Sequence, residues 1–221
     1  KSKIVSNSKL SKEVKAWISY DLGNSAFATT VVAAFFPIFY NLYWASGVDP
    51  VISAQYLSWT LVISNVALLF TAPLIGAITD ISRSTKYLFM SMVMISIFCV
   101  ALLFFVEAGS WVFALVFFGI ANYFFSASNV LYDKILVQIA SPDLFSKISG
   151  YGYAWGYFGG GLLFLVNAMM SLYPEAFGLS SQADAIRWSF ITVSIWWTIF
   201  LIPLSLNYRD RITKKSNNLL K

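Results

Sequence analysis

The spacing of charged residues divides the chain into long apolar stretches. Six segments contain no Asp, Glu, Lys or Arg, namely 22–48, 50–79, 87–106, 108–132, 148–174 and 188–208. Each reaches the roughly 20 residues that an α-helix needs to cross about 30 Å of hydrocarbon. Barrel strands would instead alternate apolar and polar residues over about 10 positions, and these runs do not alternate. The pattern predicts an all-α integral membrane protein with six transmembrane helices, at about 18–42, 56–79, 87–106, 111–132, 150–172 and 187–207.

The overall composition agrees with this prediction. The chain is 58% hydrophobic and 11% charged, and its mean hydropathy is +0.70. A soluble domain carries about 25% charged residues, so this chain lacks the polar residues for an ordinary wetted surface. We expect its main environment to be a lipid bilayer.

The lysines and arginines are concentrated on one side of the predicted spans. All of them except Arg187 lie before the first span, after the last, or in the loops between spans 2 and 3 and spans 4 and 5. The positive-inside bias therefore places both termini in the cytoplasm. We expect a cytoplasmic basic N-terminus (1–15), a six-helix transmembrane bundle (16–208) and a cytoplasmic basic tail (209–221). This distribution accounts for the net charge of +5 without a nucleic-acid partner, and it fits a multi-pass protein of a bacterial cytoplasmic membrane.

Residue usage argues against catalysis. The chain has no histidine and one cysteine, Cys99. A six-helix serine protease needs a Ser–His pair, and a zinc membrane protease needs histidine ligands. A glycine-rich phosphate loop ending in Gly-Lys-Ser/Thr is also missing. We expect neither an enzyme nor a bound metal or cofactor.

The first span carries an unusual carboxylate. Asp21 and Asn24 lie near the start of "WISYDLGNSAFATTVVAAFFPIFY". Asp21 follows Trp17, a candidate interface anchor, by one turn and would lie only about 6 Å into the membrane. It is therefore either an interface carboxylate that pairs with the preceding lysines or a cavity-facing group that binds a proton or a cationic group. We favour the second interpretation.

Span 4 carries a stripe of polar residues. Asn122, Ser126, Asn129 and Asp133 follow one another at i, i+4, i+7 and i+11, which places them on one helical face. Such a face either lines a passage for a solute or joins neighbouring helices through hydrogen bonds. Both interpretations stay open, and Asp133 also fits a position at the membrane interface.

Span 5 carries a glycine repeat. Gly152, Gly156 and Gly160 recur every four residues, so one face is bare backbone that a neighbouring helix can approach closely. Helix packing is favoured over direct ligand contact. Tyr153 and Tyr157 are also four residues apart, and we expect them to line a passage beside this glycine seam.

The loop "GAITDISRSTK" between spans 2 and 3 has a pattern of its own. Gly76, Asp80, Arg83 and Lys86 resemble the loop that joins spans 2 and 3 in the major facilitator superfamily. A carboxylate at a helix end and basic groups that pair in only one conformation would form a conformational latch. An ordinary charged cytoplasmic loop is the alternative, and the latch is favoured.

Several motifs together resemble one family. "YDLGNSAFAT", "GAITD", "LYDKILVQIA" and "ISGYGYAWGYFGGGLL" look like the vacuole effluxer-like family (autophagy-related amino-acid effluxers) of the major facilitator superfamily. The resemblance covers about residues 15–170 and corresponds to the N-terminal six-span half of a twelve-span fold. The chain departs from the family in lacking the second six spans, and in having Asp133 followed by Val137 and Gln138 where relatives often have Asn and then Pro-Asp.

The resemblance implies a function and an arrangement of helices. It implies a secondary active transporter, or its N-terminal half, that moves a small solute, with amino acids as candidates, by alternating access. Spans 1 and 4 would line the central passage, spans 2 and 5 would meet a second six-span half or a second copy, and spans 3 and 6 would face lipid. The alternative is a six-span subunit from a truncated or split gene, without transport activity of its own.

Overall fold

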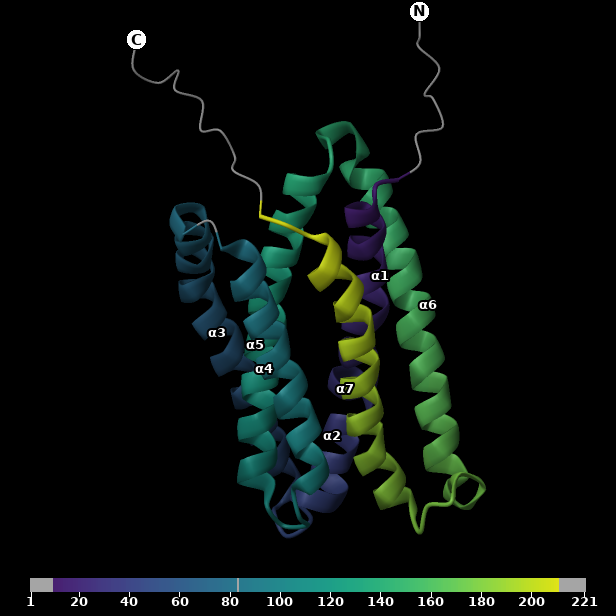
Figure 1. Ribbon diagram of the computed structural model, residues 1–221. Helices are drawn as coiled ribbons and strands as arrows, with labels where there is room; N and C mark the ends of the chain where they lie inside the picture. Colours follow the sequence, from purple (N-terminus) through teal and green to yellow (C-terminus); the bar gives the residue numbers. More distant parts are fainter. Residues whose placement is uncertain (1–9, 83, 211–221) are drawn as a thin grey trace, which may run out of the picture.

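The computed structural model describes residues 10–82 and 84–210. Within them six helical segments are long and apolar enough to cross a membrane, which confirms the all-α prediction with six long apolar helices. The segments run up and down side by side (Figure 1). The first helical residue, Lys12, and the last, Asn207, lie at the same end of the bundle.

The first segment changes helix type along its length. It consists of α1 (Lys12–Ala26), the π-helical η1 (Phe27–Phe35), α2 (Phe36–Phe39) and the π-helical η2 (Tyr40–Trp44). Ser11 caps α1, because its side chain accepts a hydrogen bond from the Val14 amide at 3.2 Å. π-Helix is rare and occurs mostly as single-turn bulges, so this first segment differs from the other five.

The other five segments are regular α-helices with short 3₁₀ extensions. They are α3 (Pro50–Ser82), α4 (Thr85–Leu102) with η3 (Leu103–Phe105), α5 (Trp111–Ile139), η4 (Pro142–Leu144) with α6 (Phe145–Leu172), and η5 (Pro174–Phe177) followed by α7 (Gln182–Asn207). Most extend beyond the predicted spans, and α5 continues to Ile139 although its predicted span ends at 132. Apolar runs mark only the part of a helix in hydrocarbon, whereas backbone hydrogen bonding continues into the polar zone.

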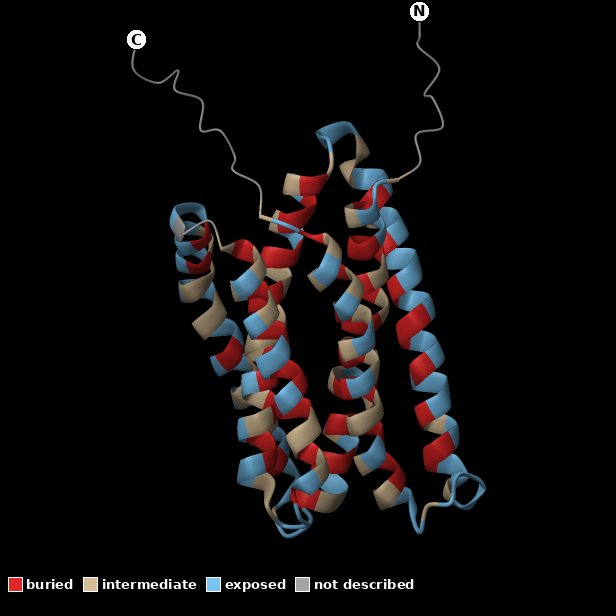
Figure 2. Ribbon diagram, in the orientation of Figure 1, coloured by how far each residue is buried: buried red, intermediate tan, exposed pale blue. Residues whose placement is uncertain are grey.

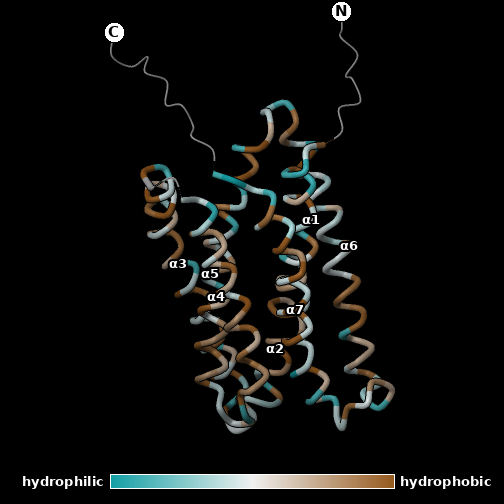
Figure 3. The backbone as a smooth tube through the Cα atoms, viewed as in Figure 1, coloured by the Kyte–Doolittle hydropathy of each residue, from teal (hydrophilic) through white to brown (hydrophobic). Residues whose placement is uncertain are grey.

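The segment that begins with α1 lies at the centre of the bundle. α1 packs against α6 and α7, while α5 packs against α3 and α4. Large aromatic side chains fill the space between these groups, and Phe27 lies between Phe125 and Trp197, with ring centroids 4.8 and 5.4 Å away. Figure 3 shows hydrophobic residues along the helices and hydrophilic ones mainly toward the helix ends and connections.

Two helices leave much of their surface uncovered. Of the described side chains of α3, only Ser53, Ser64, Ile75 and Thr79 are buried. α6 is likewise exposed on its outer side, as Figure 2 shows. The exposed residues on both helices are mainly large and apolar, for example Phe70 on α3 and Phe158 on α6. Such surfaces suit lipid or another helical unit, and not water.

Candidate functional site

A small pocket with polar walls opens where α1, α5 and α6 meet. Its volume is about 210 Å³. We call it the polar pocket, and its lining residues are Trp17, Asp21, Asn24, Asn129, Tyr132, Asp133, Ser149 and Tyr153. The pocket therefore brings together five of the passage candidates that the sequence indicates, from three different helices.

A ladder of hydrogen bonds orients the α1 side of the pocket. The Trp197 indole donates to the Tyr20 hydroxyl (3.2 Å), and that hydroxyl donates to Asn24 Oδ1 (3.3 Å). The Asn24 amide in turn donates to Asp21 Oδ1 at 3.4 Å. Asp21 is only 8% exposed. Within the described residues no lysine or arginine forms an ion pair with it, so its carboxylate is held by an amide and not by a cation.

Trp17 and Tyr132 form the wall between α1 and α5. Their rings stack with centroids 4.2 Å apart, the Trp17 indole donates to the Tyr132 carbonyl (2.9 Å), and the Tyr132 hydroxyl donates to the Trp17 carbonyl (2.8 Å). Trp17 is 3% exposed. The expectation that Trp17 anchors the chain in the membrane interface is therefore wrong, because its ring packs inside the protein, and the depth of Asp21 cannot be counted from it.

The polar face of α5 divides into two parts. Asn129 and Asp133 line the polar pocket, whereas Asn122 and Ser126, which lie closer to the N-terminus of α5, do not. Asp133 is exposed. The oxygen Oδ1 of Asn129 is buried and accepts no hydrogen bond from the described part of the chain. An acceptor in that condition has room for a donor from water or from a ligand.

The glycines of α6 allow it to approach α1 closely. A Cβ at Gly156 would lie 2.5 Å from Ser25 Oγ and 2.7 Å from Asp21 Oδ2, and one at Gly152 would lie 3.0 Å from the Trp17 ring. A Cβ at Gly160 would meet the Ser25 backbone at 3.1 Å. Gly159, which the four-residue repeat does not include, has the tightest backbone contact, because its Cβ would lie 2.9 Å from Leu22 Cα.

The two tyrosines of α6 have different positions. Tyr153 lines the polar pocket, whereas Tyr157 is 75% exposed and lies outside it. A turn before Tyr153, Ser149 also lines the pocket. Its four-residue spacing from Tyr153 is the sequence signal that would have found it.

An ion pair joins the last turns of α3 to α5. The Lys134 ammonium on α5 donates to Asp80 Oδ1 at 2.6 Å, to Thr79 Oγ1 at 2.7 Å and to the Gly76 carbonyl at 3.4 Å. The Lys86 backbone amide donates to both oxygens of Asp210, at 3.1 and 3.3 Å. Arg83 lies outside the described residues. Asp80 therefore pairs with Lys134, a residue that the loop pattern alone did not indicate.

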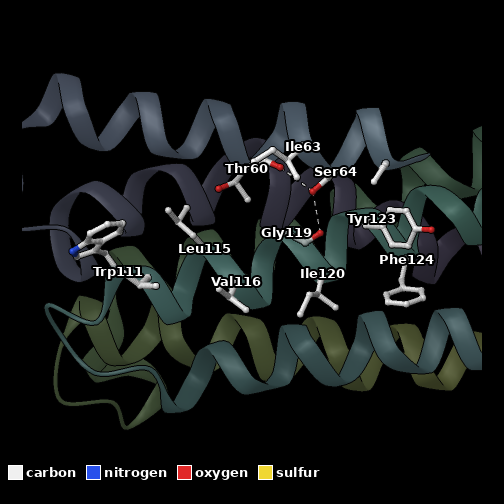
Figure 4. Close-up of a pocket in the computed structure, with 12 residues that line it drawn as sticks. Thr60, Ile63, Ser64, Trp111, Leu115, Val116, Gly119, Ile120, Tyr123 and Phe124 are labelled. Carbon is white, nitrogen blue, oxygen red and sulfur yellow. Dashed lines mark hydrogen bonds between the residues drawn. The ribbon is translucent and has the colours of Figure 1, made fainter. Parts of the chain in front are cut away.

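A second hollow lies between α3 and α5 (Figure 4). This α3–α5 groove has a volume of about 410 Å³ and mostly apolar walls. Its polar groups bond within the protein, since the Ser64 hydroxyl contacts the Gly119 carbonyl (3.1 Å) and the Tyr123 hydroxyl donates to Thr71 (2.8 Å). A Cβ at Gly119 would lie 2.9 Å from a Thr60 methyl group, so this glycine allows a second close helix contact.

The chemistry of the polar pocket suits a small polar or cationic group. It offers two carboxylates, two amide side chains and three aromatic rings. In the described part of the chain no cluster of three or more metal-binding side chains occurs. Polar and ionisable residues inside a membrane usually face the protein interior or a cavity, and they mark solute and proton paths.

Comparisons with known proteins identify the family. Residues 9–221 match the family model described as "Vacuole effluxer Atg22 like". The chain is also similar to YxiO of Bacillus subtilis (strain 168), described as an uncharacterized MFS-type transporter, with 31% identity over 205 residues. That alignment covers 92% of this chain and 48% of the relative, so the chain spans about half the length of the relative it matches. No solved structure was found to match.

Proposed function

Because the chain belongs to the Atg22-like family of major facilitator transporters, we propose that it acts as one six-span half of a secondary active transporter. Its solute is small, and amino acids are the candidates. The observation that carries this proposal is the polar pocket, where α1, α5 and α6 enclose a carboxylate and an unpaired amide oxygen inside an apolar bundle. The family consists of transporters, so no catalytic role is proposed.

The pocket is suited to the positively charged end of such a solute. The carboxylate of Asp21 is held by Asn24, while Asn129 Oδ1 has no donor of its own among the described residues. An ammonium group carries three donors and no acceptor, so it complements a carboxylate and an amide oxygen. We propose Asp21, Asn24 and Asn129 as ligands for this group or for a coupling proton, with Asp133 and Tyr153 at the rim.

A single six-span half needs a partner for alternating access. Rocking of two units around a central site alternately opens that site to each side of the membrane. The exposed apolar surfaces of α3 and α6 are the proposed contact faces for a second half or a second copy. The pair formed by Lys134 and Asp80 would act as the latch, held in one conformation and released in the other.

The exposed apolar surfaces of α3 and α6 also fit a second candidate function. In this case the chain would be a six-span subunit that assembles with a partner and does not transport on its own. In both cases we place the protein in the cytoplasmic membrane with both ends in the cytoplasm, on the basis of its basic residues.

The proposal is tested with the complex that the chain forms in its own membrane. An affinity tag on the chain would isolate that complex, and its mass in detergent would show whether the chain is single or paired. Reconstituted vesicles would then be screened for uptake or exchange of each amino acid in a radiolabelled panel. Saturable uptake of at least one solute supports the transporter, whereas a paired complex without uptake supports the subunit.

A further inference from the structure

A further hollow lies beside the close contact between α1 and α6 (the α1–α6 seam), on the side away from the polar pocket. It has a volume of about 500 Å³ and lies between α1, α6 and α7. We call it the lipid groove, and its lining residues are Leu10, Lys15, Ile18, Ser19, Leu22, Tyr151, Trp155 and Phe200. We propose that this groove binds one anionic phospholipid from the leaflet on the side of the N-terminus.

The walls of the groove carry few hydrogen-bonding groups. Apart from Lys15, the aliphatic and aromatic lining is interrupted only by the hydroxyls of Ser19 and Tyr151 and by the indole N–H of Trp155. The Ser19 hydroxyl already donates to the Ala16 carbonyl at 2.9 Å. A polar solute would lose its bonds to water in such a groove and gain few in return. An acyl chain has no such bonds to lose, so it fits the walls.

The positive charge lies at one end of the groove. α1 and α6 run in the same direction, because Gly152 lies against Trp17 and Gly160 lies against Ser25. Lys15 on α1 therefore lies at the same end as Lys147 on α6. The Lys147 ammonium is 6.0 Å from the ring centroid of Tyr151, which lines the groove. From Lys15 to Leu22 the apolar floor continues for about 10 Å along the helix axis.

Both lysines are available to an anionic headgroup. Lys15 and Lys147 are exposed, and neither forms an ion pair with another described residue. The groove thus combines an apolar channel along the membrane normal with two cations at its outer end. A phospholipid with a net negative headgroup has the complementary shape and charge, whereas a zwitterionic lipid satisfies the channel but not the charge.

The proposal is tested by native mass spectrometry of the full chain, titrated in detergent with phosphatidylglycerol or phosphatidylcholine of identical acyl chains. We expect the first phosphatidylglycerol to bind more tightly than the first phosphatidylcholine. Lys15→Gln should weaken phosphatidylglycerol roughly five-fold, the contribution of one lysine near an anionic lipid surface, and leave phosphatidylcholine unchanged. The matched control is Lys12→Gln, which removes the same charge from an exposed position outside the groove.

A second pair of variants tests the channel and not the charge. Ser19→Trp fills the groove and should remove the first tight site for phosphatidylglycerol, whereas Ser91→Trp, at an exposed position of α4 outside the groove, should not. Equal affinities of the wild-type chain for the two lipids would overturn the proposal. It would also be overturned if Lys12→Gln weakened binding as much as Lys15→Gln, or if Ser19→Trp bound phosphatidylglycerol like the wild type.

Discussion

The polar pocket and the lipid groove lie on opposite sides of the seam between α1 and α6, and they share no lining residue. On one side of α1 Asp21 and Asn24 line the polar pocket, and on the other Ile18 and Leu22 line the lipid groove. Inside a membrane, polar side chains face the protein or a cavity because lipid offers them no hydrogen bonds. The difference therefore indicates which side of α1 belongs to a solute path and which side belongs to lipid.

The closeness of the seam keeps these two sides apart. Gly156 and Gly159 let α6 approach α1 until no side chain fits between the helices. Without a hydrophobic drive inside the bilayer, such close packing is one of the main forces that hold membrane helices together. The contrast between pocket and groove thus depends on a few glycines.

The largest expected difference is in thiol labelling, which reports the side of the membrane on which both hollows open. Ser46 and Ser141 are exposed at opposite ends of the bundle, and the native Cys99 is buried. With both termini in the cytoplasm, a membrane-impermeant thiol reagent should label Ser46→Cys in intact cells. It should label Ser141→Cys only after permeabilisation. The reverse pattern would invert the topology and with it the leaflet that supplies the lipid groove.

The next effect concerns the seam itself. Gly159→Ala should destabilise the protein by roughly 1–3 kcal/mol, because the new methyl group overpacks against the Leu22 backbone. Gly161→Ala is the matched control, since its Cβ would meet no atom within 4 Å. Alanine is the better helix former, so the control should be neutral or more stable by up to about 1 kcal/mol. Thermal unfolding of the purified variants measures both, and equal shifts would contradict the close contact.

A smaller expected difference is in thiol reactivity, which distinguishes a water-filled polar pocket from a lipid-filled groove. Ser149 lines the polar pocket and Ser19 lines the lipid groove, and both are half-buried. The thiolate is the group that attacks a thiosulfonate, and apolar surroundings disfavour its formation. Ser149→Cys should therefore react with a charged thiosulfonate at a rate near that of Ser141→Cys, whereas Ser19→Cys should react much more slowly. Similar rates for Ser19→Cys and Ser149→Cys would remove the distinction between the two hollows.

The smallest effect concerns the pair formed by Lys134 and Asp80. Asp80 is 74% exposed, so Lys134→Met should change the unfolding free energy by less than about 1 kcal/mol. If the pair acts as a latch, its loss should still change the rates of solute exchange, and Lys12→Met, on the exposed start of α1, should not. A large loss of stability together with unchanged exchange would identify the pair as a purely structural contact.

The sequence was sufficient for the helices and for much of the polar pocket. Charge-free runs found the six long helices because hydrocarbon excludes charge, and the glycine repeat on α6 corresponds to a close contact with α1. The repeat missed Gly159, because whether a glycine faces a neighbour depends on how the helices cross. Trp17 was misplaced for a similar reason, since only the packing of α5 shows that its ring is covered by Tyr132.

A local sequence pattern also could not predict contacts between residues that lie far apart in the chain. Lys134 and Asp80 are separated by 54 residues, and no spacing rule connects them. The π-helical stretch from Phe27 to Phe35 was not foreseen, because a charge-free apolar run predicts a membrane span without specifying its helix type. Of the predicted polar stripe of α5, only Asn129 and Asp133 line the pocket.

The most direct test of the central claim is solute uptake by the isolated complex carrying Asp21→Asn. The amide keeps the shape of the side chain, so the complex should fold and insert. Solute uptake should fall roughly ten- to hundred-fold. This loss corresponds to about 1.5–3 kcal/mol, the contribution of a hydrogen bond to a charged group. Asp143→Asn, an exposed carboxylate outside the pocket, should transport like the wild type. Uptake by Asp21→Asn at the wild-type rate and with the wild-type pH profile would show that the polar pocket is not the solute path.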